Sequence, residues 1–295
     1  MAFRSTIAAS AIHCDRNVRQ RETPDGATTA VRALQAVAAA PGMRHHSVFH
    51  TLPGHPALMK PFLASYFAVF LQALPKMLKA ARPRHVRTCP ICGYEGYFAP
   101  VGRPPRLEAK CRQCGSKERH RLFWLWFAGR KEQLAEPILH FAPEKTLSSR
   151  LRALYADYRT ADLYKDADLK LDIENMDLPD GSLNTVICNH VLEHVDDRKA
   201  LGELARVLSP AGRLVCSVPI VEGWEKTYEN DAVATPRERE MHFGQKGHVR
   251  YYGRDFRDRL REAGFARIEE VTAEGPEVVR YGLWRGEKFF ICSRN

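Results

Sequence analysis

Residues 178–219 of this 295-residue chain, LPDGSLNTVICNHVLEHVDDRKALGELARVLSPAGRLVCSVP, decide which fold to expect. The run 184–195 is apolar over most of its length, which is typical of a strand buried on both faces of a sheet. Residues 196–208 are amphipathic and predict a helix, with one face formed by Leu201, Leu204 and Leu208. A Ser-Pro-Ala-Gly turn at 209–212 ends that helix, and 213–220 is predicted as the next strand. Strand, helix and strand in this order predict a parallel sheet.

The same alternation continues on both sides of this stretch. Five further segments have the apolar pattern of strands: 137–142, 158–164, 168–179, 267–275 and 287–295. Two more segments are predicted as helices: 145–156 and 254–265. Strands that alternate with helices over some 160 residues predict an α/β domain with a doubly wound sheet over residues 137–295.

Four of the eight cysteines form two Cys-x-x-Cys-Gly steps, which are Cys89, Cys92, Cys111 and Cys114. This spacing is that of structural zinc sites, so a zinc-ribbon-like module is predicted over 86–121 with Zn²⁺ held by these four thiolates. Four protein ligands close the metal's coordination shell, which indicates a structural rather than a catalytic metal. Two disulfides or a redox dithiol are the alternatives. The other four cysteines are isolated, which favours a reducing compartment and a cytoplasmic protein.

The N-terminal third offers less specific patterns. Residues 1–57 are predicted to be disordered, with a transit peptide or an upstream start codon as explanations of their composition. Residues 58–82 predict an apolar or amphipathic helix with basic ends, which either contacts a membrane surface peripherally or packs on protein. Residues 122–136 are predicted to connect the zinc module to the α/β domain through a helix rich in aromatic side chains.

Charge is unevenly distributed along the chain. Residues 1–135 hold 21 Lys and Arg against 7 Asp and Glu, whereas residues 136–295 hold 24 against 28. A basic N-terminal half suits RNA, a membrane surface or a phosphorylated substrate, and a solvated linker is the alternative. Basic residues also follow the second cysteine pair, which favours RNA as a partner of the zinc module.

The order of elements from residue 137 onward resembles the class I S-adenosylmethionine-dependent methyltransferases of the type 11 kind. The segments that carry the resemblance are 172–197 and 200–219. The resemblance implies a Rossmann-like domain, S-adenosyl-L-methionine as cofactor and transfer of its methyl group. It also implies that the cofactor lies along the carboxyl ends of the first four strands.

Carried over residue by residue, the resemblance assigns the cofactor's ribose to Asp162. It assigns the adenine to Asp172 and Ile173, and the methyl-transfer site to Asn189 and His190. A carboxylate suits the ribose because it accepts from both hydroxyls at once. Each assignment has a structural alternative: Asp162 could cap the following turn, and His190 could be a histidine of the core.

The loop after the first strand departs from the family's glycine-rich pattern. It reads His-Phe-Ala-Pro-Glu-Lys-Thr at 140–146 and contains no glycine. Ala142 and Glu144 are nevertheless the predicted cofactor contacts, with Glu144 meeting the ammonium or sulfonium group. Either this loop binds the cofactor in a modified way, or the domain has lost the cofactor and serves as a scaffold.

A long insertion at 221–256 is predicted to build the substrate contacts. It gathers polar and aromatic residues, which are Glu225, Tyr228, His242, His248, Arg250 and Tyr252. Glycines around them predict turns that aim His248 and Arg250 inward. His190 and His248 are the candidate catalytic bases, because imidazole accepts a proton near neutral pH. A metal held by His242 and His248 is not favoured, since their spacing fits no standard site.

These features leave three functional hypotheses. The first is a methyltransferase acting on a small molecule or a carbohydrate intermediate. The second is a methyltransferase whose basic zinc module binds RNA. The third is a non-catalytic zinc-binding interaction protein with a degenerate cofactor pocket. The methyl acceptor and the oligomeric state are not encoded in any of these motifs.

Overall fold

The computed structural model describes residues 56–81, 85–102, 105–128 and 130–294. The chain divides into two compact units, Met1–Tyr66 and Phe67–Asn295. The prediction of disorder over 1–57 lies outside the described residues, apart from the two that begin helix α2 (Pro56–Ala81). From residue 67 to residue 79, α2 exposes several large apolar side chains, among them Phe67, Phe70 and Met77. None of the described helices combines the length and hydrophobicity needed to cross a bilayer.

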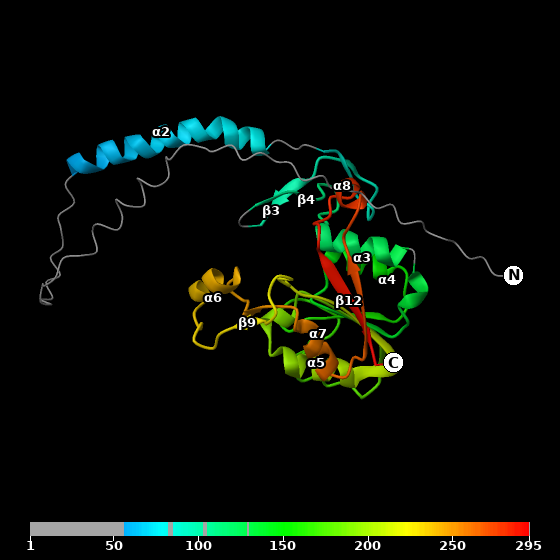
Figure 1. The fold of residues 1–295 in the computed structure, drawn as a ribbon. Helices are drawn as coiled ribbons and strands as arrows, with labels where there is room; N and C mark the ends of the chain where they lie inside the picture. The colour runs from blue at the N-terminus through cyan, green and yellow to red at the C-terminus, as the bar shows by residue number, and fades with distance from the viewer. Residues whose placement is uncertain (1–55, 82–84, 103–104, 129, 295) are drawn as a thin grey trace, which may run out of the picture. The chain divides into compact units, whose positions relative to one another are not determined.

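A six-stranded, mostly parallel sheet forms the centre of the second unit, in the order β11-β12-β8-β7-β5-β6 (Figure 1). Four parallel strands occupy one side: β5 (Ile138–Phe141), β6 (Tyr158–Ala161), β7 (Leu183–Asn189) and β8 (Leu208–Ser217). Two antiparallel strands complete it: β12 (Lys288–Ser293) and β11 (Arg267–Thr272). This topology confirms the predicted Rossmann-like α/β fold.

Helices cover both faces of the sheet (Figure 1). They are α3 (Glu118–Ala128) and α4 (Lys145–Arg152) on one face, and α5 (Asp197–Val207) and α7 (Phe256–Glu262) on the other. Neighbouring residues of β7 illustrate why: Val186 packs with Leu201 of α5, whereas Ile187 packs in the cluster that contains Phe123 of α3. Both faces of the strand are buried, which explains its unbroken apolar sequence.

The predicted third strand does not form. Residues 168–179 contribute an isolated parallel bridge between Ala161 and Leu169 and a second bridge between Asp172 and Asn175. The Asp168 carboxylate accepts from the backbone N–H of Thr160 at 2.8 Å. Aspartate side chains therefore occupy backbone donors that a regular ladder would use, and this competition ends the pairing.

Two further boundaries differ from the sequence prediction. The connecting helix α3 starts at Glu118, inside the predicted zinc module, and ends at Ala128, followed by a short 3₁₀ helix η1 (Lys131–Gln133). Strand β8 starts at Leu208, because the strand pairs on both sides of the Ser-Pro-Ala-Gly turn: Leu208 faces Leu183 and Arg213 faces Thr185.

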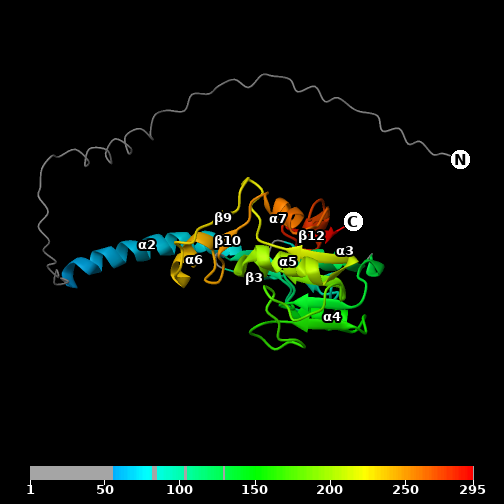
Figure 2. The same cartoon turned by 90° about the horizontal axis from the view of Figure 1, so that it is seen from below.

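The insertion is more ordered than its sequence suggested. It contains a two-stranded ribbon, β9 (Tyr228–Glu229) with β10 (Arg250–Tyr251), and helix α6 (Pro236–Phe243). Figure 2 shows these three elements together at one end of the domain. Thr235 and Glu238 form a capping box at the start of α6, and Pro236 occupies its first turn. Helix α8 (Glu277–Arg280) precedes the last strand.

The cysteine-bearing segment consists of two small hairpins. The first pairs β1 (Arg87–Thr88) with β2 (Glu95–Gly96), and the second pairs β3 (Ala99–Val101) with β4 (Arg106–Lys110). Arg121 of α3 is fully buried beneath them and donates hydrogen bonds to the carbonyls of Ser116, Ala109 and Tyr281. Its guanidinium also lies 4.6 Å from the centre of the Phe98 ring. These contacts join the hairpins to the α/β domain in one continuous core.

Candidate active site

The predicted site residues of the α/β domain follow the carboxyl ends of its parallel strands. After β5 the chain moves outward to β6 and then returns to the other side of β5 to form β7. Ligands of open α/β sheets bind at such a switch point, outside the carboxyl ends of the strands. Ala142 follows β5, Asp162 follows β6, and Asn189 ends β7. The topology thus brings these three predicted residues to one edge of the sheet.

The glycine-free loop after β5 adopts the backbone shape of a glycine loop. Ala142 has a φ of 45°, a left-handed conformation that L-residues seldom adopt, and its N–H donates to the Ala161 carbonyl at 2.8 Å. Strain of this kind costs about 1–3 kcal/mol and concentrates at functional sites. An alanine therefore holds the turn where the resembling family places glycine.

Glu144 lies at the end of this loop among basic side chains. Its carboxylate is 3.2 Å from Nε2 of His140, 3.5 Å from Nε2 of His120 and 3.8 Å from Nε of Arg119. Burial alone would raise the pKa of the Glu144 carboxyl, but the hydrogen bond and the charge of His140, together with the other two neighbours, lower it to about 2. Glu144 is therefore ionised at neutral pH.

A cavity of about 10 Å³ borders this carboxylate. It is lined from several elements, including Arg119 and His120 of α3, Glu144, Asn189 of β7 and Ser217 of β8. Three buried atoms around it have no hydrogen-bond partner among the described residues: Nε of Arg119, Nε2 of His120 and Oε1 of Glu144. Buried polar atoms normally find a partner, so this donor and acceptor set suits a polar, charged ligand group.

His120 gives a pH-dependent prediction for the wall of this cavity. Burial, followed by the charges of neighbouring Arg and Lys residues, lowers the pKa of His120 to about 3, whereas the unfolded chain titrates near 6.5. Below pH 6.5 the unfolded state binds the extra proton, so stability falls as the pH drops towards 3. The expected slope is about 1.4 kcal/mol per pH unit. Urea unfolding of wild type and His120→Gln between pH 6.5 and 5 checks this: the variant should lose that slope, and parallel curves would contradict the prediction.

The two other predicted cofactor acids both lie in turns. Oδ1 of Asp162 accepts backbone N–H bonds from Tyr164 and Lys165, each at 2.8 Å. Its other oxygen, Oδ2, forms no hydrogen bond among the described residues. Asp172 is exposed and accepts the N–H of Glu174 at 2.9 Å. Ile173 is buried in the core cluster. The roles of these three residues towards ribose and adenine stay predictions.

At the end of β7, Asn189 and His190 are tied to β8. Oδ1 of Asn189 accepts from Oγ of Ser217 at 3.0 Å, and the N–H of His190 donates to the Ser217 carbonyl at 2.8 Å. His190 has a φ of 53°, a strained backbone conformation for a residue with a Cβ. Nδ1 of its ring lies 3.1 Å from Oε1 of Glu193. The strained turn thus directs the imidazole towards a carboxylate.

Glu193 joins the two predicted catalytic histidines. Its side chain is fully buried, and the same Oε1 atom that bonds His190 lies 3.9 Å from Nε2 of His248. Burial alone would raise the pKa of Glu193, but the His190 hydrogen bond and charge lower it. Burial lowers the pKa of His248, so its imidazole is neutral at neutral pH. Sequence reasoning missed Glu193, although it stands three residues after His190 in the quoted stretch.

The insertion residues fall into two groups, and Arg250 is aimed inward as predicted but towards backbone carbonyls of the protein. Arg250 is buried and donates to the carbonyls of Leu192 (2.9 Å) and Val195 (2.5 Å) at the 3₁₀ helix η2 (Leu192–His194). Tyr252 is also fully buried, and its hydroxyl donates to Asp197 at 3.0 Å. These side chains hold the insertion onto the domain instead of facing a substrate.

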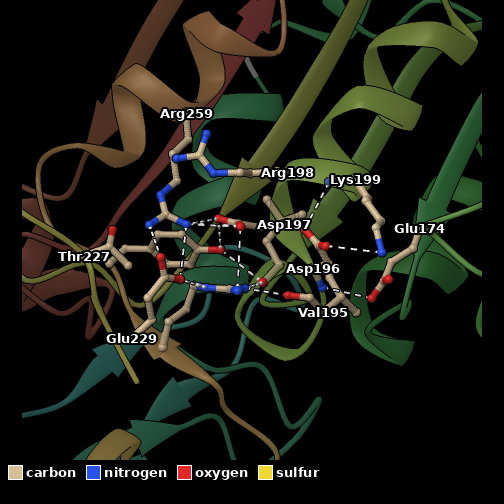
Figure 3. Close-up of polar contacts among 12 residues, drawn as sticks. Glu174, Val195, Asp196, Asp197, Arg198, Lys199, Thr227, Glu229 and Arg259 are labelled. Atoms are coloured by element: carbon tan, nitrogen blue, oxygen red, sulfur yellow. Dashed lines mark hydrogen bonds and ion pairs between the residues drawn. The ribbon is translucent and has the colours of Figure 1, made fainter. Parts of the chain in front are cut away.

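Figure 3 shows the polar network that anchors the insertion, with Arg259 of α7 between Asp197 and Glu229. Nη1 of Arg259 lies 2.9 and 3.1 Å from the two carboxylate oxygens of Asp197, and Nη2 lies 2.8 Å from Oε1 of Glu229. Asp197 and Arg259 are both buried. In contrast, Tyr228 and His242 form an exposed pair, with the hydroxyl 2.6 Å from Nδ1.

The four predicted zinc ligands lie together in two turns, one between β1 and β2 and the other between β4 and α3. Sγ of Cys89 is 3.6 Å from Sγ of Cys114, and Sγ of Cys92 is 3.7 Å from Sγ of Cys111. All four thiols are free, and their sulfurs lie within 4.8 Å of one another. Thiolates on one tetrahedral zinc with bonds of about 2.3 Å are about 3.8 Å apart. The arrangement therefore has the dimensions of a four-sulfur metal site.

The two cysteine turns repeat one backbone geometry. The N–H of Gly93 donates to the Cys89 carbonyl at 2.9 Å, and the N–H of Gly115 donates to the Cys111 carbonyl at 3.0 Å. The φ angles of these glycines are 76° and 74°, which favour glycine at both positions. The turns bring each pair of thiols to the same side of its hairpin.

Comparisons with known proteins place a methyltransferase domain within this sheet. The family model described as "Methyltransferase domain" matches residues 147–216. A search of the curated proteins found no match.

Solved structures with a similar chain path include three methyltransferases. An S-adenosylmethionine-dependent methyltransferase of Mesorhizobium loti is 16% identical, with 59% of this chain and 98% of that chain covered and a TM-score of 0.41. A possible histamine N-methyltransferase of Thermotoga maritima is 18% identical, with 59% and 95% covered and a TM-score of 0.37. The 1,6-didemethyltoxoflavin-N1-methyltransferase of Burkholderia thailandensis, which holds S-adenosylhomocysteine, is 12% identical, with 82% and 91% covered and a TM-score of 0.38.

Proposed function

We propose that this chain, in which residues 147–216 match a methyltransferase domain, is an S-adenosylmethionine-dependent methyltransferase whose methyl acceptor is a small molecule or a carbohydrate intermediate. The observation that carries the proposal is the enclosure of the strand ends by the insertion. His248 is 4% exposed and the His190 side chain is 24% exposed, so both candidate bases are largely covered by protein rather than lying on an open surface. Enclosed sites of this kind are typical of small ligands.

The basic residues after the second cysteine pair support this choice over RNA. Arg121 and His120 are buried, and Arg119 points towards Glu144. Three of the five basic side chains that favoured RNA are thus directed into the protein, whereas Arg112 is exposed and Lys117 is half-buried. An RNA-binding surface needs exposed cations that contact phosphates. Salt-dependent binding of RNA to the whole protein would instead favour the RNA methyltransferase hypothesis.

The residues around the small cavity suit the amino-acid portion of the cofactor. Arg119 offers a guanidinium to its carboxylate and Glu144 offers a carboxylate to its ammonium, and both contribute buried atoms without a partner. The cavity has the volume of one water molecule. Cofactor binding therefore requires the side chains of Arg119 and His120 to move outward. Asp162 would hold the ribose through Oδ2.

The chain's own residues would align the acceptor and take up its proton. The cofactor supplies an electrophilic methyl group on a sulfonium, which an acceptor oxygen or nitrogen attacks in line. During the transfer, the imidazole of His190 or His248 would take up the proton that the acceptor loses. Glu193 stabilises the resulting imidazolium, because it lies beside both rings. Alignment of the two reactants supplies much of the rate enhancement.

We also propose that the four cysteines bind Zn²⁺ as a structural ion. Four thiolates on one zinc carry a net charge of −2, and the buried Arg121 guanidinium reaches Ser116, whose hydroxyl contacts Cys89 and Cys114 at 3.3 Å. A buried cation without a carboxylate partner is costly unless a negative group lies close by. A zinc–thiolate centre supplies that negative charge.

The cofactor assignment is tested by Asp162→Asn. Asparagine keeps an oxygen for the N–H groups of Tyr164 and Lys165 but replaces Oδ2 with a donor. We expect at least tenfold weaker binding of S-adenosylhomocysteine by calorimetry, about 1.4 kcal/mol, with an unchanged melting temperature. Asp166→Asn, an exposed acid in the same loop, is the matched control and should bind normally. Equal affinity of both variants would mean that Asp162 only caps the turn. If the folded wild type does not bind S-adenosylhomocysteine, the proposal that this chain is a methyltransferase is wrong.

A further inference from the structure

Three side chains with metal-ligating atoms gather between η2 and the insertion. They are Glu193 and His194 of η2 and His248 of the insertion. One ligand atom from each lies within 4.8 Å of the other two. His248 lies 54 positions after His194 in the chain, so only the fold brings the group together. None of these atoms belongs to the cysteine cluster.

Glu193 is the least expected member, because a fully buried carboxylate is costly unless its charge is compensated. Its Oε1 has the hydrogen bond to His190, but Oε2 is buried without any hydrogen-bond partner among the described residues. The neighbouring Nε2 of His190 is also buried without a hydrogen-bond partner among the described residues, 4.0 Å from Oε1 of Glu287. A buried carboxylate oxygen without a hydrogen-bond donor is suited to bind a cation.

One of the two other histidines, His194, is oriented as metal-binding imidazoles usually are, with its second ring nitrogen hydrogen-bonded to a backbone carbonyl. Nδ1 of His194 lies 3.0 Å from the Gly247 carbonyl, which accepts a hydrogen bond from the Nδ1–H group and leaves Nε2 with a free lone pair. A Cβ at Gly247 would lie 3.0 Å from that Nδ1, so glycine permits the close approach. Nε2 of His248 points to Oε1 of Glu193, and its ring meets the His194 ring edge-on with centroids 4.7 Å apart. Nδ1 of His248 is buried without a hydrogen-bond partner among the described residues.

The distances between the candidate ligand atoms are close to those expected around one metal ion. Two ligand atoms each 2.0–2.2 Å from one metal lie at most about 4.4 Å apart. The 3.9 Å between His248 and Glu193 already satisfies this limit. His194 lies at the surface, where a small rotation of its side chain brings Nε2 nearer to the other two.

We propose that Glu193, His194 and His248 bind a divalent cation of the first transition row, such as Mn²⁺ or Zn²⁺. Two imidazoles and one carboxylate suit these ions rather than Mg²⁺ or Ca²⁺, which prefer oxygen ligands throughout. Three protein ligands leave coordination positions open, and His190 acts as a positioning residue that holds the Glu193 carboxylate. The ion lies beside the His190 turn, where the methyl group is expected.

This inference rests on the proposed methyltransferase function and narrows its acceptor to one with an oxygen that binds the ion. Coordination lowers the pKa of a hydroxyl group, as it does that of metal-bound water. The hydroxyl then loses its proton to a neighbouring imidazole or to water, and its oxygen forms the bond to the methyl carbon as the carbon–sulfur bond breaks. The product is a methyl ether.

Manganese titration of the full-length protein, with its zinc content measured beforehand, tests the site. Electron paramagnetic resonance reports free Mn²⁺, and we expect wild type to remove one equivalent from solution. His194→Ala and His248→Ala should each weaken binding at least tenfold. His242→Ala is the matched control, because this histidine of the insertion pairs with Tyr228 and should leave Mn²⁺ affinity unchanged. His194 is exposed, so its variant should fold normally even where His248→Ala does not.

Two results would overturn the inference. The first is a wild type that removes no Mn²⁺ from solution and takes up no Zn²⁺ beyond the one equivalent expected for the cysteine site. The second is a folded His194→Ala variant that binds Mn²⁺ with the affinity of wild type. Calorimetry with S-adenosylhomocysteine on the same samples separates this outcome from failure of the proposed function. Cofactor binding without a second metal would refute the metal site alone.

Discussion

Replacing Arg259 with methionine should lower the free energy of unfolding by about 3–5 kcal/mol. The Asp197 carboxylate is 2% exposed and receives Nη1 of Arg259 at 2.9 and 3.1 Å. Methionine fills much the same volume but leaves this carboxylate buried with the Tyr252 hydroxyl as its remaining hydrogen-bond donor within 3.5 Å. A buried charge that loses its partner costs far more than an exposed one does, because water cannot replace the lost contact. Urea unfolding followed by circular dichroism measures the loss.

Arg261→Met is the matched control for this prediction. Arg261 occupies the same helix, and its pair with Asp258 at 2.8 Å joins two side chains that are more than half exposed. Such surface pairs contribute little, so this variant should stay within about 0.5 kcal/mol of wild type. Arg250 lies 3.7 Å from Asp197 on the other side. A loss below about 1 kcal/mol for Arg259→Met would show that Arg250 replaces the missing charge and that the network is not a single unit.

The parallel part of the sheet was predictable because its signal is local. Strand β5 and the second halves of β7 and β8 are buried on both faces, and burial of this kind favours a largely apolar sequence. The segment 168–179 carries a similar apolar pattern, yet Asp168 and Asp172 use their side chains as acceptors of backbone N–H groups. Hydrophobic pattern alone does not reveal such competition. The aspartates at 168 and 172 were the sequence feature that indicated an irregular segment instead of a strand.

Helix α6 was missed for a different reason. Thr235-Pro236-Arg237-Glu238 has the sequence of a capping box with proline in the first turn, which is a specific start signal. The following residues have no apolar stripe, and only Phe243 is buried. A helix that contributes so little to the core has almost no periodicity to detect, so its cap was the only local evidence.

The position of the candidate site could be predicted from the sequence, but the contacts between its residues and other elements could not. Strand ends identify the edge at which Asn189 and His190 must lie, because parallel strands share that edge. The partners of these residues come from elsewhere: His248 belongs to the insertion, and Arg119 and His120 belong to the helix that follows the cysteines. Such pairs depend on tertiary packing. The basic residues after the second cysteine pair therefore suggested RNA in the sequence, whereas in the structure Arg119 and His120 line the small cavity beside Glu144.

Removing zinc should accordingly weaken cofactor binding as well as unfold residues 86–121. The cysteine module contacts the start of α4 directly: Oγ1 of Thr146 donates to the Cys114 carbonyl at 2.9 Å, and Nε of Arg150 donates to the Ile91 carbonyl at 3.0 Å. Structural zinc contributes about 10–16 kcal/mol to the folding of zinc-finger peptides. Its loss should free the module, release these contacts and displace Glu144 at the preceding loop. We expect at least a tenfold loss of S-adenosylhomocysteine affinity after chelation, measured by calorimetry, with recovery on adding Zn²⁺.

Thr146→Val separates this coupling from general unfolding. Valine keeps the shape of threonine but cannot donate to the Cys114 carbonyl, so the zinc site stays intact while one link to the cofactor loop is lost. We expect normal zinc content and a cofactor affinity between those of the wild type and the chelated protein. Ser149→Ala on the same helix is the matched control, since its hydroxyl bonds only within the helix, to the Lys145 carbonyl at 2.9 Å. Zinc-free protein that binds the cofactor as well as wild type would mean that the module and the loop are independent. In that case the contacts of Thr146 and Arg150 would only stabilise the fold, because their loss would leave Glu144 and the strained Ala142 turn in place.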